Sequence, residues 1–478
     1  MKSRRIYQTV ALLATTLCVS SCMFGPTYNR PEMDIPAAFR STGSSDSSVA
    51  DLPWWKVFKN SDLQSLISDT YSHNRDLKAM MASVEQARQY VTVAQAPLFP
   101  WAGYGGSASK GANSAMGNLT NNGARTMQPG AVQASASWEL DLWGKTRRQT
   151  ESAIAEYLAT EEAQRNLMLS LMGQVANGYL QLLQLDEQLS IMKDSVDSYT
   201  ESYRLFKEQM EGEVGDKLQV ASAEAALAAS QAKIPLLEAE IVSMENTLSV
   251  LAGRAPGKIK RSGNLMQLGN AVNIPAGIPA QILNRRPDIR QQEQYMRSAN
   301  AKVGVAIANY FPSISLTAQS GLVTSDLRHV VGKSGAWGVN ANMTGPLFQA
   351  GSLRASERMA KQEFINAKNA YEQTVLNALS EVSSTLVLRN KLSSVTTDQN
   401  RAVAAYMTAM TASMERYRAG LSDYFEVLYA QQNLFPSQIQ LSQYKYQYAQ
   451  TLVNLYIALG GGWKMNSQQI LDASTTKK

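Results

Sequence analysis

The sequence contains few of the residue types on which most enzymes and metal sites depend. Among 478 residues there are two cysteines and two histidines. The histidines, His73 and His329, are too few for a histidine-based metal site, and neither lies in the spacing of a catalytic triad. Cys18 lies in a segment that we expect to be removed, which leaves Cys22 and no disulfide. We therefore predict no enzyme activity, no metal and no cofactor.

Long apolar runs and clusters of one charge are also missing. After the first 22 residues no stretch of 18 apolar residues occurs, which argues against a transmembrane helix. The formal charge of +6 falls to +3 once Lys2, Arg4 and Arg5 are lost, and no Lys/Arg run is left to bind nucleic acid. With 44% hydrophobic and 18% charged residues, the chain can bury a large core, so we expect a folded protein without a nucleic-acid partner.

The first 22 residues are typical of a cleaved export signal. A basic start is followed by an apolar stretch over residues 10–19 and by small residues just before Cys22. This pattern resembles a bacterial lipoprotein signal, which is cut before the cysteine and leaves Cys22 as the acylated N-terminus. An ordinary secretory signal with a chance cysteine is the alternative. We predict a signal peptide over 1–21 and, over 22–50, a Pro- and Ser-rich extended segment that tethers the body to lipid.

Four segments predict β-strands with one apolar and one polar face. Between Val132 and Leu142, apolar residues alternate strictly with Gln, Ser, Glu and Asp. Segments 313–322 and 337–347 alternate in the same way, and 101–110 is a poorer, Gly-rich fourth. Aromatic residues gather at the segment ends, as in the girdles of transmembrane barrels: Phe99, Trp101, Trp143, Phe311 and Phe348. Because roughly eight strands are the smallest bacterial barrel, four strands could span a membrane only if several chains share one barrel.

The remaining sequence predicts very long helices in a repeated plan. After Gly144 no helix breaker occurs before Gly212, and apolar residues repeat every seven positions from Met168 to Tyr203. A helix of about 65 residues would be on the order of 100 Å long and would need coiled-coil partners. The second half repeats the first: a helix, two strands, a long helix, a Gly turn and a return helix. The opening helix of each half is predicted over Ser61 to about Ala96 and over Ala280 to Asn309, and the long helix of the second half runs to about Tyr417. In this repeat Asp216 corresponds to Asp423.

Several strings resemble the outer membrane factor family of TolC-type efflux channels, and within it the NodT-type lipoproteins of resistance-nodulation-division systems. The strings are ELDLWG at 139–144, ILNRRPDIR at 282–290, ANAKVGVA at 299–306, FPSISLT at 311–317 and LYIALGGGW at 455–463. The resemblance implies a mostly helical, two-repeat fold with four transmembrane strands per chain. It also implies a homotrimer with a twelve-stranded barrel in the outer membrane and a coiled-coil helical tunnel in the periplasm.

The resemblance also implies partners and functional residues. The partners would be a periplasmic adaptor protein, an inner-membrane pump and outer membrane lipid. A gate at the periplasmic end would use Tyr417, Asp423, Glu426 and Tyr429, although Tyr429 stands where many members carry Asp. The adaptor would contact the helix turns at Gly212, Asp216, Gly420 and Ser422. From the residues alone, the alternative for Asp423 and Glu426 is that they are solvated residues capping the start of the return helix, and Asp216 is better explained as a helix cap than as a gate residue.

We predict the following organisation: a first repeat over 51–256 with a hairpin at about 100–143, a connector over 257–279, a second repeat over 280–464 with a hairpin at about 312–348, and a tail over 465–478. The predicted function is that of a passive exit duct for small toxic compounds in a tripartite efflux pump. Copper or silver efflux and type I protein secretion stay open as alternatives, and a structural coiled-coil lipoprotein is the alternative of another class. The sequence leaves the substrate undetermined.

Overall fold

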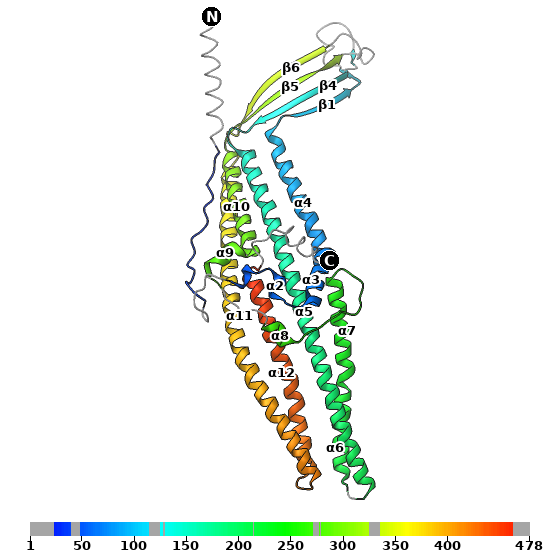
Figure 1. The fold of residues 1–478 in the computed structure, drawn as a ribbon. Coiled ribbons are helices and arrows are strands. Elements are labelled where there is room, and N and C mark those ends of the chain that lie inside the picture. Colours follow the sequence, from blue (N-terminus) through cyan, green and yellow to red (C-terminus); the bar gives the residue numbers. More distant parts are fainter. Residues whose placement is uncertain are drawn as a thin grey trace. The chain divides into compact units, whose positions relative to one another are not determined.

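The computed structural model of the chain is mainly helical (Figure 1), and its described residues are 23–39, 48–113, 125–127, 130–213, 215–270, 277, 279–324 and 335–461. Cys22, His329, the predicted signal peptide and the predicted tail lie outside the described residues. The chain divides into two compact units. Unit 1 comprises Met1–Glu32, Ser83–Thr160 and Gln291–Tyr371, and unit 2 comprises Met33–Ala82, Glu161–Arg290 and Glu372–Lys478.

Unit 1 contains an antiparallel sheet of the four predicted strands. They are β1 (Trp101–Ala108), β4 (Gly130–Leu140), β5 (Ser313–Thr324) and β6 (Gly335–Thr344), in the order β1-β4-β5-β6. A second sheet pairs β2 (Gly111–Asn113) with β3 (Arg125–Met127). Strand β4 ends two residues earlier than predicted. Asp141 instead accepts the backbone N–H groups of Thr146 and Arg147, both at 3.0 Å, at the start of the next helix.

The strand register produces one continuous apolar face across the sheet. Leu140 lies opposite Ile314, which lies opposite Met343, and Ala102 begins a row that continues through Ala136 and Ala318 to Val339. Val339 and Met343 are 71% and 68% exposed. The other face carries Ser, Thr, Asn and Gln side chains and the carboxylate of Glu139. This division of faces is that of a sheet with lipid on one side and water on the other.

Residues 23–32 of unit 1, within the predicted extended tether, form a strap that is held by tertiary contacts. The Arg148 guanidinium donates to the carbonyl oxygens of Phe24 (3.0 Å) and Gly25 (3.2 Å), and the Phe24 ring stacks on Phe311 with 4.5 Å between centroids. Further along, Tyr28 and Arg30 both bond the buried carboxylate of Glu293. The segment is extended as predicted, but these contacts fix it to the helices.

Two helices of equal length connect the strands to the helix turns. Helix α5 (Lys145–Glu211) and helix α11 (Ser352–Arg418) each have 67 residues, which confirms the long uninterrupted helices. The return helices are α6 (Lys217–Gln231), α7 (Lys233–Leu251) and α12 (Tyr424–Ala458). The heptad positions Met168, Val175 and Leu182 on α5 are at most 1% exposed. Among the described helices, none has a stretch apolar and long enough to span a bilayer.

The helix predicted from Ser61 to about Ala96 is interrupted. It consists of α3 (Ser61–His73) and α4 (Arg75–Gln95), because the backbone of Asn74 leaves the helical region with ψ at 132°. The Asn74 side chain accepts the Leu77 N–H (2.9 Å) and donates to the Leu251 carbonyl (2.9 Å). One asparagine therefore caps the new helix and holds the end of α7, a role that periodicity could not reveal.

The helix predicted from Ala280 to Asn309 is interrupted as well. It divides into α9 (Ile282–Arg285) and α10 (Pro287–Ala308), with a short 3-10 turn before α9. Pro287 excludes a helical conformation at Arg286, whose ψ is 123°. Two further short helices, α2 (Trp54–Val57) and α8 (Leu265–Gly269), belong to unit 2.

Arg286, in the string ILNRRPDIR at 282–290, links three helices of unit 2, and we call its set of contacts the clasp. Its guanidinium bonds both carboxylate oxygens of Asp288 (3.0 and 2.7 Å), Glu381 on α11 (2.7 Å) and the Ala458 carbonyl at the end of α12 (2.8 Å). The Arg286 side chain is 11% exposed. The Arg-Pro-Asp step therefore joins α10, α11 and α12 through a single side chain.

We predict that Arg286→Ala lowers the free energy of unfolding by roughly 2 to 3 kcal/mol, because it leaves a half-buried carboxylate and a helix-end carbonyl unpaired. Thermal unfolding of the detergent-purified protein measures this loss. Arg401→Ala is the matched control, since the Arg401–Asp398 pair is 82% and 67% exposed and should contribute little. Equal stability of both variants would contradict the clasp.

Candidate gate at the helix turns

The two helix turns of unit 2 have the same local design. Asp216 and Asp423 are the N-caps of α6 and α12, accepting the backbone N–H of Leu218 (2.9 Å) and Phe425 (3.3 Å), respectively. Gly420 has a φ of +69°, a conformation that glycine adopts without strain and that ends α11. We call the two turns, at residues 212–213 with 215–216 and at residues 419–423, together with the adjoining helix ends, the tip. The predicted capping role of Asp216 is confirmed.

A cluster of aromatic and aliphatic side chains fills the interior of the tip. The Phe206 ring of α5 lies 3.8 Å from the Tyr424 ring of α12 and 6.0 Å from that of Tyr417 on α11. The buried members are Tyr199, Phe206, Ala223, Tyr424, Val427, Leu428 and Phe435. Burial raises the pKa of Tyr199 to about 12, with a smaller contribution from Tyr424, so this phenol stays neutral at physiological pH. The cluster joins the α5–α6 hairpin to the α11–α12 hairpin.

Polar contacts join the same two hairpins around this cluster. The Tyr417 hydroxyl donates to Gln209 (2.9 Å), and Arg418 pairs with Glu201 at 3.1 Å, both between α11 and α5. The Gln219 amide of α6 donates to Asp423 at 3.5 Å. These contacts would have to break if the α11–α12 hairpin moved away from α5. Gln209, Arg418 and Glu201 were missed by the sequence analysis, because their partners are about 200 residues away.

The predicted gate residues fall into two groups. Tyr417 and Asp423 contact the other hairpin, whereas Glu426 and Tyr429 lie three residues apart on the exposed side of α12. Glu426 pairs with Arg416 at 3.5 Å, with both side chains about half exposed, and Tyr429 is 71% exposed. An exposed ion pair of this kind contributes little to stability, so other contacts can replace it at little cost in free energy.

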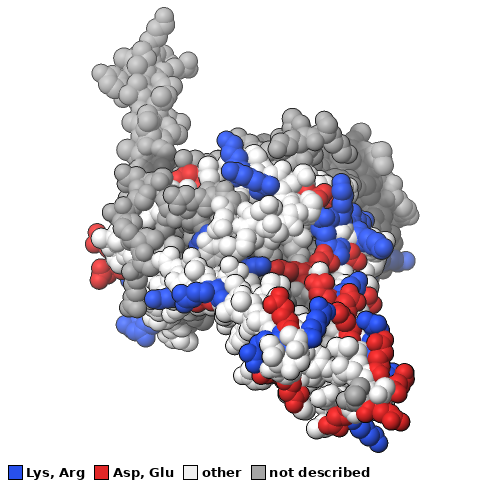
Figure 2. All heavy atoms as spheres, turned by 60° about the horizontal axis from the view of Figure 1, so that its bottom comes forward, with Lys and Arg blue, Asp and Glu red and all other residues white. Residues whose placement is uncertain are grey.

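The predicted adaptor contacts occupy the turns themselves. Gly212 directly follows α5, and Gly420 lies two residues after α11. Asp216 is itself the N-cap of α6, and Ser422 directly precedes Asp423, the N-cap of α12. The Ser422 hydroxyl is buried and has no hydrogen-bond partner among the described residues. In Figure 2, which brings the bottom of Figure 1 forward, acidic and basic side chains are interspersed over this surface. No large region of a single sign is visible there.

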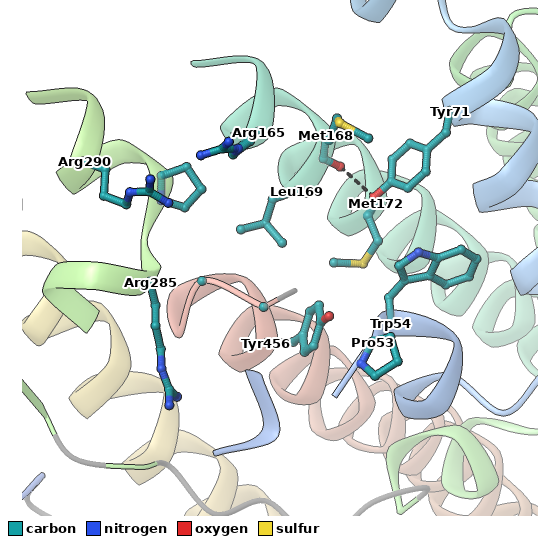
Figure 3. A pocket seen from close by; sticks show the side chains of 13 residues that line it. Pro53, Trp54, Tyr71, Arg165, Met168, Leu169, Met172, Arg285, Arg290 and Tyr456 are labelled. Carbon is teal, nitrogen blue, oxygen red and sulfur yellow. Dashed lines mark hydrogen bonds between the residues drawn. The ribbon is translucent and has the colours of Figure 1, made fainter. Parts of the chain in front are cut away.

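A small pocket in unit 2 is lined in part by residues of the string ILNRRPDIR at 282–290 (Figure 3). Arg285, Arg290 and Arg165 surround one side, while Tyr456, Met172 and Trp54 form an apolar side. The cavity measures about 40 Å³, which is the space of one or two water molecules rather than of a transported compound. Arg165 and Arg290 both pair with the buried Glu162 nearby. This pocket therefore belongs to the packing of unit 2.

Comparison with known proteins identifies the family. The family model described as outer membrane efflux protein matches residues 66–254 and again residues 278–461. The chain belongs to the outer membrane efflux protein family. The double match confirms the two-repeat organisation, and membership confirms an outer membrane efflux channel.

Curated relatives and solved structures agree with this assignment. The toluene efflux pump outer membrane protein TtgC of Pseudomonas putida is 33% identical over 464 residues, 95% of each chain. The cation efflux system protein CusC of Escherichia coli K12 is 30% identical over 452 residues, covering 93% of this chain and 97% of CusC. The outer-membrane channel OprN superposes with a TM-score of 0.86 at 30% identity, covering 93% of this chain and all of OprN. The TolC-like fold predicted from the sequence is thereby confirmed.

The capping role of Asp423 can be separated from its charge. Asp423→Ala should destabilise the start of α12 by about 1 kcal/mol, whereas Asp423→Asn, a good N-cap without charge, should not. Hydrogen exchange over residues 424–428 measures the difference, with Asp216→Ala and Asp216→Asn as the matched pair on α6. Equal protection in the Ala and Asn variants would show that Asp423 does not cap.

Proposed function

We propose that three copies of this chain close one twelve-stranded barrel in the outer membrane and act as the passive exit duct of a tripartite efflux pump. The observation that carries this proposal is the open sheet: β1 and β6 each have one edge without a strand partner among the described residues. Unpaired backbone groups cannot face lipid, and four strands cannot close on themselves. Pairing β6 of one copy with β1 of the next gives every edge strand a hydrogen-bonding partner and keeps the apolar face toward the lipid.

We further propose that Cys22 carries the lipid, in line with the strap that begins at Met23. The Met23 side chain lies against Gly144, at the point where β4 is followed by α5. Gly144 directly follows Trp143, whose ring stacks on that of Phe311 with 5.0 Å between centroids. An acyl group on Cys22, the residue before Met23, would then be attached near this ring pair. Aromatic side chains of this kind favour the membrane interface.

The gate in this proposal is the tip. Three copies of Glu426 and Asp423 around one axis would repel each other and attract cations, while the Tyr417–Gln209 and Arg418–Glu201 contacts hold each α11–α12 hairpin inward. Opening then replaces these contacts by others to an adaptor protein seated on Gly212, Asp216, Gly420 and Ser422. An inner-membrane pump supplies the energy and selects the substrate. The relatives named for toluene and for cation efflux make organic compounds and metal ions the two classes to test.

Trimer closure predicts a crosslink between the two sheet edges. Gly105 on β1 and Gly338 on β6 lie on the polar face, and an added Cβ at either position meets nothing within 4 Å. The double variant Gly105→Cys/Gly338→Cys should give dimer and trimer bands with a short bismaleimide in outer membranes, because each edge meets the other on a neighbouring copy. The two single variants are controls. Failure of the double variant to exceed them would contradict edge pairing.

Loosening the gate should increase the conductance of the channel. Tyr417→Ala combined with Glu426→Ala or Asp423→Ala should raise single-channel conductance in planar bilayers severalfold, because each double variant removes a contact to α5 and an acidic group. Arg401→Ala, at an exposed position of α11 outside the tip, is the control. If none of the variants conducts more than the wild type, the tip is not the constriction.

Substrate class is tested by deleting the gene and measuring susceptibility to dyes, antibiotics, solvents, copper and silver. Sensitivity to several organic compounds, restored by the wild-type gene, would support organic efflux. Sensitivity limited to copper and silver would instead support metal efflux.

A further inference from the structure

Unit 2 contains a second and larger hollow, which the duct function does not use. It is a groove of about 290 Å³ between α8, α11 and α12. We call it the α11 groove; its lining residues are Met266, Asn270, Ser393, Thr396, Thr397, Asn400, Leu441, Lys445 and Tyr448. Ser393, Thr396, Thr397 and Asn400 follow one face of α11 at helical spacing, so the groove is formed by regular helices.

The lining of the α11 groove is polar but uncharged overall. No carboxylate lines it, and its one cation, Lys445, is paired with Glu187 at 2.7 Å. The Ser393 hydroxyl, the Asn400 amide and the Asn270 amide nitrogen have no hydrogen-bond partner among the described residues. The groove therefore offers neutral donors and acceptors and has no strong attraction for an ion.

An aromatic ring completes the α11 groove and is held in place from behind. The Arg389 guanidinium lies 4.3 Å from the centre of the Tyr448 ring and donates to the Tyr448 hydroxyl at 3.1 Å. The same hydroxyl donates to the side-chain amide oxygen of Asn270 at 3.0 Å. Arg389 also donates to the Gly269 carbonyl of α8 (2.9 Å), which ties α8 to this ring. Tyr448 is thus fixed before any ligand arrives, which lowers the entropy cost of binding.

We propose that the α11 groove binds an N-acetylated glycan. Amide groups at Asn270 and Asn400 can pair with acetamido groups, the hydroxyls of Ser393 and Thr397 can pair with sugar hydroxyls, and the Tyr448 ring offers an apolar surface to sugar C–H groups. Such sugars are available to a periplasmic helical extension either in the cell-wall network or as soluble fragments. Binding to the network would hold the channel in the wall, and binding to fragments would make the groove a soluble-ligand site.

The test compares the full-length detergent-purified protein with a groove variant. Ser393→Ala/Thr397→Ala/Asn400→Ala alters three exposed positions of α11, where alanine is a good helix former, so folding should be preserved. Thr408→Ala/Thr411→Ala is the matched control on the same helix, because these hydroxyls bond carbonyls four residues earlier, as that of Thr397 does. Binding is measured by cosedimentation with purified sacculi and by titration with soluble N-acetylglucosamine oligomers.

We expect the wild type and the control to bind and the groove variant to bind at least tenfold more weakly at an unchanged melting temperature. Ser393→Trp, which fills the groove, should abolish binding as well. Sedimentation with sacculi alone would identify the wall network as the ligand source, and binding of the oligomers would identify soluble fragments. No binding by the wild type, equal binding by the groove variant, or displacement by inorganic phosphate alone would overturn the proposal. None of these outcomes bears on conductance or edge crosslinking.

Discussion

The need to pair every backbone hydrogen-bonding group in lipid is the constraint on which the remaining structure depends. A four-stranded sheet with an apolar face and two open edges is not stable alone in a membrane. The chain's own strands are joined across the two repeats, β4 with β5, so among the described residues the free edges are β1 and β6. In the proposed trimer, neighbouring copies of the chain complete this sheet. The oligomer would then be a consequence of the strand order rather than an addition to the fold.

The repeat explains why the helices are so long and so similar. Both α5 and α11 have 67 residues, and each is followed by a turn that ends in an Asp N-cap. Equal lengths let the two hairpins end at matching positions, where their aromatic side chains pack together in the tip. The two repeats differ in the side chains that they place at the tip. The second hairpin contributes Tyr417 and Arg418 to contacts with α5, which the proposed opening of the gate would break.

Periodicity made the main elements predictable from the sequence. Alternation over two residues identified the four strands, and heptads identified α5, because both patterns record which side is buried. The breaks at Asn74 and Arg286 were not predicted, since each depends on one side chain whose partners are distant: Leu251 for Asn74, and Glu381 and Ala458 for Arg286. The strap was missed for the same reason. Its Pro-rich composition predicts an extended chain, but only tertiary contacts decide whether that chain is docked.

The candidate gate shows the same limit more sharply. Tyr417, Asp423, Glu426 and Tyr429 could be named from a family resemblance, whereas Gln209, Arg416, Arg418 and Glu201 could be found only from geometry. Asp423 combines a helix cap with a contact between the two hairpins, because one oxygen accepts both the Phe425 N–H and the Gln219 amide. A carboxylate that starts α12 is held rigidly by that role. The position of its charge is then fixed relative to the hairpin, so any movement of the hairpin carries the charge with it.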